Sequence, residues 1–327
     1  MPDFSKAFDR VDHQILIQKF IQYGVRSSVI PWICSFLTNR SQAVCYNGTL
    51  SDWLTTHAGV PQGTKLGPIA FLTMINDAGS SSEGIKHCKY VDDMCFCQVI
   101  TDPVQSQTMQ QELECFNQWA LSNNMKLNPS KCNFMFINFE RSTPNPPTLQ
   151  IGNSPINRTD SLKILGVLVQ ENLKWDNQID SMCKAFSRRL FYLRQLKRCG
   201  IPIPDLFTVY VEYIRPTLEY ATPVWHSGLS KKQQECLEHL QRKAFRIILS
   251  YDYCANHSYS EICSQFNIPP LFQRREQLCA SFGKSLLHSH KFRHWLPPTR
   301  NNGLRNNNHL SSFRCRTNRY KGSTIPI

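Results

Sequence analysis

Apolar residues recur at helical spacing in several parts of the chain. Val11, Ile15, Leu16 and Phe20 follow a period of three to four residues before Gly24, a pattern that predicts a helix. Further along, Ser-x-x-Gln at residues 230–233 is a capping-box sequence in front of another apolar stripe. By these criteria we expect helices over residues 9–23, 28–37, 67–76, 102–125, 176–198, 230–249 and 274–288.

Short apolar runs beside turn residues predict β-strands. Residues 43–46 and 53–57 flank Asn47-Gly48, a dipeptide typical of tight hairpins. Residues 86–90 and 94–100 flank Val91-Asp92-Asp93, which predicts a second hairpin with acidic residues at its tip. Further strands are expected over residues 133–138 and 162–169. The fold class that these elements predict is α+β, with a helical second half.

Charge is unevenly distributed along the chain. The 327 residues carry 37 Lys and Arg against 24 Asp and Glu, a formal net charge of +13. From Met182 onward there are 23 basic and 8 acidic residues, whereas the part before Met182 is nearly neutral. A basic half is typical of proteins that bind a polyanion such as nucleic acid, although charge of this kind also serves solubility alone.

Cysteine usage and the N-terminal sequence indicate the compartment. None of the 14 cysteines forms a C-x-x-C pair, and Met1-Pro2-Asp3 has neither the basic nor the apolar region of a signal peptide. We therefore expect reduced thiols and an intracellular location, in the cytoplasm or the nucleus. The longest apolar stretches are too short to span a bilayer, so we expect no membrane association.

The most distinctive local feature is the acidic pair at the tip of the second hairpin. Aspartates favour turns, so Asp92 and Asp93 could be there for the turn alone. A tight turn also holds carboxylates rigidly, and Mg²⁺ prefers such oxygen ligands. Asp3, just before a predicted helix, is a third candidate, whereas Asp9 is better explained as a helix cap. If Asp3 and Asp92 converge, their repulsion predicts a bound divalent cation.

A Gly- and Pro-containing loop at residues 59–68 provides a third candidate feature. Glycines allow a backbone to approach a ligand closely, and the amide of Gln62 can hydrogen-bond a base or a sugar. The loop lacks the Gly-Lys-Ser/Thr sequence of an ATP-binding P-loop. The alternative is an ordinary connection into the helix that follows.

These three features, in this order, resemble the reverse transcriptases of non-LTR (LINE-type, jockey-like) retrotransposons. Asp3-Phe-Ser-Lys-Ala-Phe-Asp-Arg-Val-Asp-His13 is similar to motif A of that family, Gly59-Val-Pro-Gln-Gly-Thr-Lys-Leu-Gly-Pro68 to motif B, and Tyr90-Val-Asp-Asp93 to motif C. Weaker similarity continues through Leu127-Asn-Pro-Ser-Lys131 (motif D) and Leu162-Lys-Ile-Leu-Gly166 (motif E).

The resemblance implies a role for each matching residue in RNA-directed DNA polymerisation. Asp3, Asp92 and Asp93 would hold two Mg²⁺ ions, for which Mn²⁺ could substitute, and would be catalytic. Phe8 would lie under the incoming sugar and exclude a ribose, while Gln62 and Gly63 would contact the substrate. Lys131 would protonate the leaving pyrophosphate, and would otherwise be a solvated surface lysine. The implied partners are an RNA template, a DNA primer and dNTPs.

The resemblance also implies a right-hand polymerase architecture. Residues 1–172 would form a partial palm, an antiparallel sheet backed by helices that carries motifs A to E. Residues 173–270 would form a basic α-helical thumb, and residues 271–327 a partly disordered C-terminal extension. Basic residues of the thumb could contact the phosphates of an RNA–DNA hybrid, or could form a solvated helix face: Lys184, Arg188, Arg189, Arg194, Lys197 and Arg198.

Motif A begins at the third residue, so we expect the chain to lack the fingers and the endonuclease of the parent element. The isolated chain is then expected to polymerise weakly or not at all, because a small displacement of Asp3 costs much of the rate. The alternative function is a non-catalytic nucleic-acid-binding relic of such an element. A zinc hydrolase is disfavoured, because the His and Cys residues between Cys254 and His294 match no closed zinc pattern.

Overall fold

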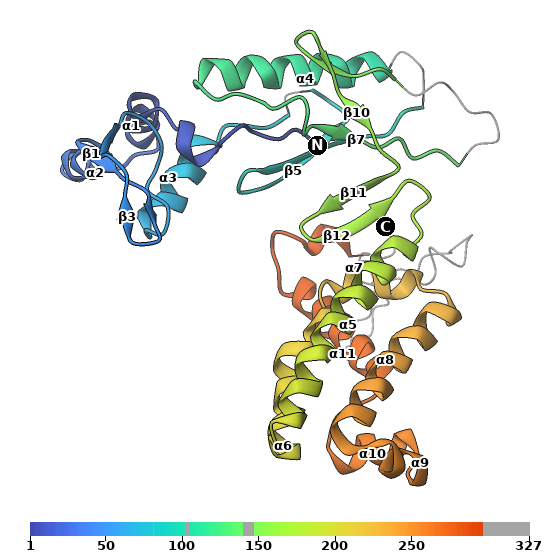
Figure 1. Cartoon of the computed structure of the whole chain (residues 1–327). Coiled ribbons are helices and arrows are strands. Elements are labelled where there is room, and N and C mark those ends of the chain that lie inside the picture. The colour runs from blue at the N-terminus through green and yellow to red at the C-terminus, as the bar shows by residue number, and fades with distance from the viewer. Residues whose placement is uncertain (81, 102–104, 140–146, 297–327) are drawn as a thin grey trace, which may run out of the picture. The chain divides into compact units, whose positions relative to one another are not determined.

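The computed structural model describes residues 1–80, 82–101, 105–139 and 147–296 (Figure 1). The chain divides into two units, Met1–Leu162 and Lys163–Ile327, termed here the N-terminal and the C-terminal unit. Three expectations fall wholly or partly outside the described residues: the predicted helix start at residues 102–104, most of a Pro-rich connection at residues 143–147, and a disordered tail after residue 296.

The helices of the N-terminal unit begin and end close to the predicted positions, with one exception. They are α1 (His13–Gln22), α2 (Ile30–Leu37), α3 (Leu66–Met74) and α4 (Gln105–Ser122), and the 3₁₀ turn η1 (Phe8–Arg10) precedes α1. The predicted helix over residues 9–23 is wrong at its start, because Asp12 has an extended backbone and caps α1. Its carboxylate accepts hydrogen bonds from the N–H groups of Gln14 and Ile15 at 2.9 and 3.0 Å.

The described strands of the N-terminal unit pair in twos. β1 (Arg40–Gln42) with β4 (Leu54–Thr56), β2 (Cys45–Tyr46) with β3 (Thr49–Leu50), β5 (Ile85–Tyr90) with β6 (Asp93–Gln98), and β8 (Gln150–Ile151) with β9 (Ser154–Pro155) are antiparallel pairs. β7 (Asn133–Phe134) and β10 (Asn157–Arg158) are parallel. The two hairpin turns predicted at Asn47-Gly48 and at Val91-Asp92 are therefore confirmed. The strands predicted around Asn47-Gly48 are only partly right, because β2 pairs with β3 and the predicted strand over residues 53–57 pairs with β1.

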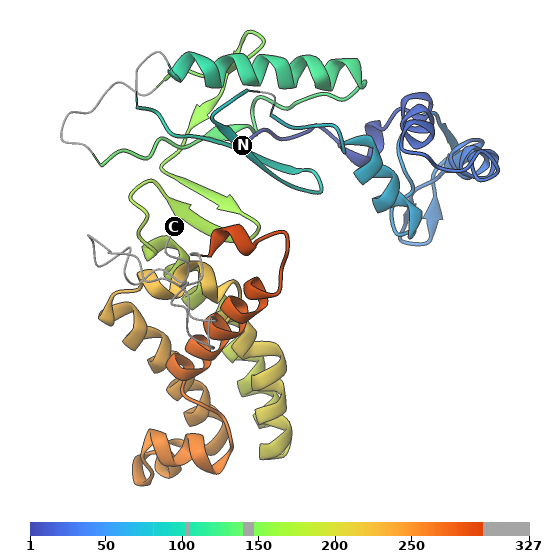
Figure 2. The ribbon, with the colours of Figure 1, turned by 180° about the vertical axis from the view of Figure 1, so that it is seen from behind.

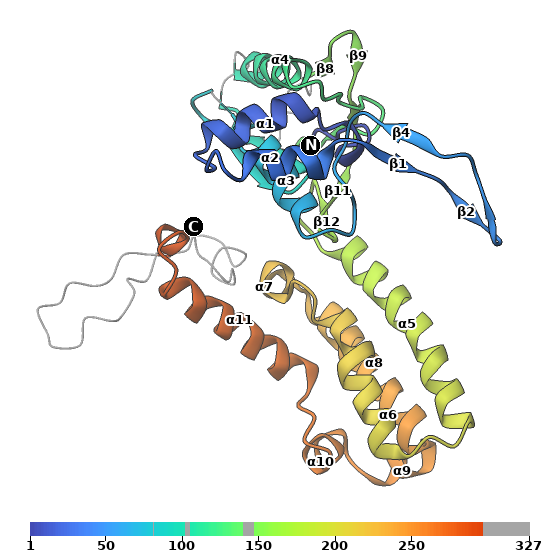
Figure 3. The ribbon, with the colours of Figure 1, turned by 90° about the vertical axis from the view of Figure 1, so that its left-hand side faces the viewer.

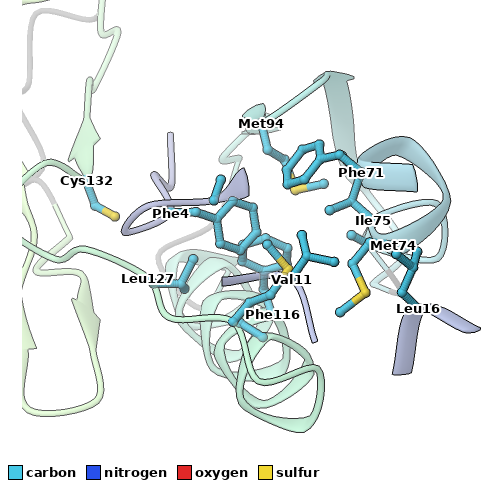
Figure 4. Packing of buried hydrophobic residues seen from close by; sticks show 14 of the residues in the cluster. Phe4, Val11, Leu16, Phe71, Met74, Ile75, Met94, Phe116, Leu127 and Cys132 are labelled. Carbon is cyan, nitrogen blue, oxygen red and sulfur yellow. The ribbon is translucent and has the colours of Figure 1, made fainter. Parts of the chain in front are cut away.

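A cluster of aromatic rings forms the centre of the N-terminal core. Phe116 of α4 is 2% exposed and contacts Phe4 with a centroid separation of 5.8 Å. The same ring contacts Phe96 of β6 edge-to-face at 5.2 Å and stacks on Trp119 at 5.6 Å. Figure 4 shows Phe4, Phe116 and Leu127 within this core. One helix residue thus joins the N-terminal segment to the second hairpin.

The C-terminal unit is mainly helical. Its elements are β11 (Ser161–Ile164, across the unit boundary), β12 (Val167–Gln170), α5 (Asp176–Arg198), α6 (Ile203–Val209), the π-helical turn η2 (Tyr210–Ile214), η3 (Arg215–Leu218), α7 (Thr222–Trp225), η4 (His226–Gly228), α8 (Lys231–Leu249), α9 (Tyr251–Asn256), α10 (Tyr259–Gln265), α11 (Leu271–Leu287) and η5 (Arg293–Trp295). The bounds of α5 and the capping box of α8 are as predicted. The predicted helix over residues 274–288 begins earlier, at Leu271.

Helices α5 and α8 pack side by side in the same direction (Figures 1 and 3). Gln233 Nε2 in the first turn of α8 donates a hydrogen bond to Asp176 Oδ1 in the first turn of α5 at 2.8 Å. Phe186 and Leu190 of α5 and Leu237 and Ala244 of α8 are fully buried in the C-terminal core. The apolar stripes that predicted the two helices are therefore the surfaces on which they meet.

A chain of buried and partly buried polar side chains links α8 to η2, α10 and α11. The Tyr210 hydroxyl donates to Gln241 Oε1 at 2.6 Å, and Gln241 Nε2 donates to the Tyr259 hydroxyl at 2.8 Å. The Tyr259 hydroxyl in turn donates to Glu238 at 2.7 Å, and Glu238 also accepts from the N–H groups at the start of α11. Burial raises the pKa of Tyr210 well above its ordinary value, which keeps this hydroxyl a donor.

The single strand predicted over residues 162–169 is wrong. Strands β11 and β12 form a hairpin there, and Leu165 and Gly166 at its tip have φ of +46° and +85°. Two successive positive φ values give the tight turn that matches the twist of adjacent strands, and glycine adopts such a value without strain. The Tyr220 hydroxyl donates to the Leu165 carbonyl at 2.7 Å, which holds the turn in place.

Within the described ranges, no helix has the length and apolar character that crossing a membrane requires.

We expect Asp12→Ala to destabilise the protein by about 1 kcal/mol, because two N–H groups of α1 lose their acceptor. The measurement is urea unfolding followed by circular dichroism. Asp12→Asn is the matched control, because the amide oxygen can still cap the helix. Equal stability of the Ala variant and the natural protein would contradict the role of this cap.

Candidate active site

Asp3 is held by backbone hydrogen bonds on both of its sides. Phe4 forms an isolated antiparallel bridge with Leu127, and Asn128 N–H donates to the Asp3 carbonyl at 2.8 Å. Asp3 N–H donates to the buried Cys132 Sγ at 3.2 Å. The segment after α4, which contains the residues that resemble motif D (Leu127–Lys131), therefore fixes the backbone of Asp3. No pattern in the sequence predicted Cys132 as the partner of Asp3.

The β5–β6 hairpin carries the acidic pair on a strained turn. Tyr90 pairs with Asp93, so the loop consists of Val91 and Asp92 alone, and Asp93 is the first residue of β6. The backbone of Val91 has φ of +53°. A β-branched residue is rare in this region, and the conformation costs about 1–2 kcal/mol. Val91 is packed against the N-terminal core, which holds the turn in place.

The structure brings Asp93 within electrostatic range of both Asp92 and Asp3. Burial, and then the charges of Asp92 and Asp3, raise the pKa of Asp93 above its ordinary value. Figures 1 and 2 show the N-terminal segment beside the β5–β6 hairpin from opposite sides. Phe4 lies next to Asp3, and Phe96 lies three residues after Asp93. Because both rings contact Phe116, their packing explains why Asp3 and Asp93 converge.

The donor set suits a hard divalent cation. Among the described residues, no three His, Cys, Asp or Glu side chains are arranged as a ready metal cage. Mg²⁺ is usually bound through one or two protein carboxylates, with water and substrate phosphates as its other ligands. Burial contributes most to the raised pKa of Asp93, and the charges of Asp92 and Asp3 add to it; a bound cation would relieve this charge repulsion.

The loop over residues 59–68 is attached to the segment that carries Asp3 and Phe8. Val60 N–H donates to the Phe8 carbonyl at 2.9 Å, and Gly59 N–H donates to the Val11 carbonyl at 2.8 Å. His13 Nε2 lies 2.7 Å from the Gly59 carbonyl oxygen. The segments that resemble motifs A and B are therefore one hydrogen-bonded structure, in which His13 is a positioning contact that the sequence did not single out.

The same loop is closed at its other end by Thr64 and Gly67. Thr64 Oγ1 donates to the Pro61 carbonyl at 2.8 Å and accepts from Gly67 N–H at 3.1 Å. A Cβ on Gly67 would lie 2.6 Å from the Pro61 oxygen, so only glycine fits there. Gln62 and Gly63, both predicted to contact substrate, are exposed at the tip between these two anchors.

Phe8 and Lys131 occupy different environments. Phe8 is partly buried and stacks on Phe71 of α3, with ring centroids 4.2 Å apart and an interplanar angle of 18°. Because Phe71 is fully buried, it fixes the plane of the Phe8 ring. Lys131 is exposed, on the segment whose Asn128 N–H bonds Asp3.

Two lysines join α3 to its neighbours by bonding the carbonyls at its C-terminal end. Lys19 Nζ, from α1, donates to the Met74 carbonyl and to Asp77, both at 2.6 Å. Lys89 Nζ, from β5, donates to the carbonyls of Ile75, Asn76 and Ala78 at 2.7–3.0 Å. Cations in this position also interact favourably with the helix dipole. Lys89 therefore ties the hairpin of Asp92 to the helix that follows the loop.

The six predicted nucleic-acid-binding residues all lie on α5, in three different environments. Lys184, Arg188 and Arg198 are exposed. The guanidinium of Arg189 instead bonds the Tyr213 carbonyl and lies 4.5 Å from the Tyr213 ring centroid, which is an internal contact. Arg194 and Lys197 are partly buried. The exposed face of α5 also presents the rings of Phe191 and Tyr192, which are 54% and 55% exposed.

The family model described as reverse transcriptase (RNA-dependent DNA polymerase) matches residues 2–169, slightly more than half of the chain. The chain belongs to the reverse transcriptase family. The resemblance drawn from motifs A, B and C is thereby confirmed.

Two curated relatives are reverse transcriptases of mobile elements. The RNA-directed DNA polymerase from mobile element jockey of Drosophila funebris is 28% identical over 234 residues, which are 68% of this chain and 25% of the relative. The protein of the same name from Drosophila melanogaster is 26% identical over 260 residues, 75% of this chain and 28% of the relative. The chain therefore spans about a quarter of the length of the curated reverse transcriptases that it matches.

Replacing Asp93 by Asn is expected to raise the melting temperature at pH 7. The folded state raises the pKa of this carboxyl, so its ionised form opposes folding at neutral pH. The stability that protonation contributes is complete below the unfolded pKa of about 3.9 and is lost as the pH rises through the folded value. The gain in Asp93→Asn should therefore shrink as the pH falls toward 4.

The measurement is thermal unfolding of both proteins across this pH range. Asp52→Asn, at an exposed position between β3 and β4, is the matched control and should show no such trend. A variant that melts at or below the natural protein at pH 7 would show that neither burial nor the neighbouring carboxylates disfavour the ionised form of Asp93 in the folded state.

Gly67→Ala is expected to destabilise the protein by roughly 1–3 kcal/mol in urea unfolding, because its methyl group meets a backbone oxygen. Gly283→Ala is the control, since a Cβ at this position in α11 meets no atom within 4 Å and alanine favours a helix. Equal losses of stability in the two variants would contradict the steric explanation.

Proposed function

We propose that the chain carries the nucleotidyl-transfer centre of a retrotransposon reverse transcriptase, which adds dNTPs to a primer 3′-hydroxyl on an RNA template. The N-terminal unit would be the palm and the helical C-terminal unit the thumb. The observation that carries the proposal is the convergence of Asp3, Asp92 and Asp93, from two segments distant in sequence. Membership of the reverse transcriptase family supports it.

Asp3, Asp92 and Asp93 would hold two Mg²⁺ ions, or Mn²⁺ in their place. Such ions lower the pKa of a bound hydroxyl and neutralise charge on a leaving phosphate. The chain contributes the fixed positions of the carboxylates: Asp3 through its bonds to Asn128 and Cys132, and Asp92 through the strained hairpin turn. Rigid placement of reacting groups is itself a large part of the rate.

Other residues would position the nucleotide. The Phe8 ring, fixed by stacking on Phe71, would support the sugar and exclude a 2′-hydroxyl by its bulk. Gln62 and Gly63, exposed on an anchored loop, would contact the base pair between template and dNTP. The exposed Lys131 would deliver a proton to the departing pyrophosphate.

The exposed residues of α5 would contact the nucleic-acid backbone. Lys184, Arg188 and Arg198 are free to approach phosphates, and such contacts are independent of sequence and weaken with salt. Arg189 contributes to the packing of α5 on η2 instead, so we assign it to the fold rather than to the template.

The experiment is incorporation of one labelled dNTP on an RNA template with a DNA primer, with Mg²⁺ or Mn²⁺ present. We expect Asp92→Asn to lower the rate at least about 100-fold, because the loss of a metal-binding carboxylate costs several kcal/mol. Asp52→Asn is the control. Metal-dependent incorporation that survives in Asp92→Asn would refute the assignment.

The second candidate function, binding of nucleic acid without catalysis, is favoured by the exposed basic and aromatic face of α5. It predicts salt-sensitive binding of an RNA–DNA hybrid with no incorporation by the natural protein under either metal. Incorporation that depends on Asp92 would exclude it.

A further inference from the structure

Two pairs of cysteine thiols lie in contact within the described residues, and neither takes part in the proposed chemistry. Cys95 Sγ and Cys97 Sγ, on one face of β6, are 3.8 Å apart. Cys183 Sγ of α5 and Cys236 Sγ of α8 are also 3.8 Å apart. All four are unpaired thiols, so each pair could in principle be oxidised.

The two pairs have equal sulfur separations but differ in the elements that they join. Cys95 and Cys97 are two residues apart on an extended strand, which places their Cα atoms about 6.6 Å apart, near the upper limit for a disulfide. Cys183 and Cys236 come from two packed helices, and each sulfur needs to move by only about 0.9 Å to reach bonding distance. A disulfide of the α5–α8 pair would cross-link two separate helices, whereas a disulfide of the β6 pair would close within a single strand.

One thiol of the α5–α8 pair is accessible, as is one thiol of the β6 pair. Cys236 is exposed on α8, so a reagent can reach it, while Cys183 beside it is only partly exposed. Burial, the neighbouring Cys236 and then Asp180 raise the pKa of Cys183 to about 12. Cys236 is thus the thiol that a reagent meets first, and Cys183 is held next to it at high effective concentration.

We propose that Cys183 and Cys236 are a redox-active dithiol that a low-molecular-weight disulfide, such as glutathione disulfide, converts into a disulfide between α5 and α8. The Cys236 thiolate attacks one sulfur of glutathione disulfide, which forms a mixed disulfide and releases a glutathione thiolate. The Cys183 thiolate then attacks Cys236 Sγ and releases the second glutathione. The two protons lost by the cysteines are taken up by the two glutathione thiolates, so two thiols are oxidised and one disulfide is reduced.

The product would tie together the first halves of two helices that are roughly 50 residues apart in sequence. A cross-link of this loop length stabilises the folded state by restricting the unfolded chain. The modification is independent of polymerase activity, so it can be tested whether or not the proposed function holds.

The experiment treats the full chain with glutathione disulfide or with reduced glutathione, followed by non-reducing trypsin digestion and mass spectrometry. We expect a cross-linked peptide that contains Cys183 and Cys236, two hydrogens lighter than the sum of its parts. We also expect the melting temperature to rise by about 5 °C or more. Cys183→Ser and Cys236→Ser should each lose both effects, and Cys95→Ser, from the other thiol pair, should keep both.

Three results would overturn the proposal. One is a stable glutathione adduct on Cys236 with Cys183 still reduced, which would show that the sulfurs cannot close. Another is a melting-temperature rise that persists in Cys236→Ser. The third is a principal cross-link between Cys95 and Cys97 or any other pair of cysteines.

Discussion

The packing of Phe4 and Phe96 on Phe116 is the interaction on which the candidate site depends. Asp3 and Asp93 lie on segments about 90 residues apart in sequence, and the contacts of Phe4 and Phe96 with Phe116 hold these segments together. One buried ring of α4 contacts both segments, so burial of apolar surface overcomes the repulsion between the carboxylates. Enlarging or emptying this core would move the acids apart without touching them.

Two features of the β5–β6 hairpin are energetically unfavourable, and hydrogen bonds of the neighbouring Lys89 offset part of their cost. The positive φ of Val91 and the raised pKa of Asp93 both destabilise the turn. Lys89 offsets them in part, because its ammonium bonds three carbonyls at the end of α3 and so fixes β5 just before the turn. A strained, repulsive site on a well-anchored strand is the arrangement expected where a charged ligand completes the structure.

In the C-terminal unit, a chain of polar side chains adds to the apolar contacts that hold the helices together. Its helices meet through apolar stripes, but Glu238, Gln241 and two tyrosines form a hydrogen-bonded chain that links α8 to three other elements. Because each buried polar group in this chain has a partner, it specifies one arrangement of the helices. That fixed arrangement leaves one face of α5 to solvent and brings Cys183 next to Cys236.

The sequence by itself determined the family, the acidic hairpin and the long helices, because motif order, periodicity and caps such as Ser230 are local properties. It misjudged the start of α1 and the hairpin at Leu165-Gly166, where one side chain or one turn decides the outcome. Tertiary structure alone decided that Cys132 bonds Asp3, that Arg189 faces Tyr213, and that Asp3 approaches Asp93. These contacts join residues distant in sequence, and their geometry follows from how the whole core packs.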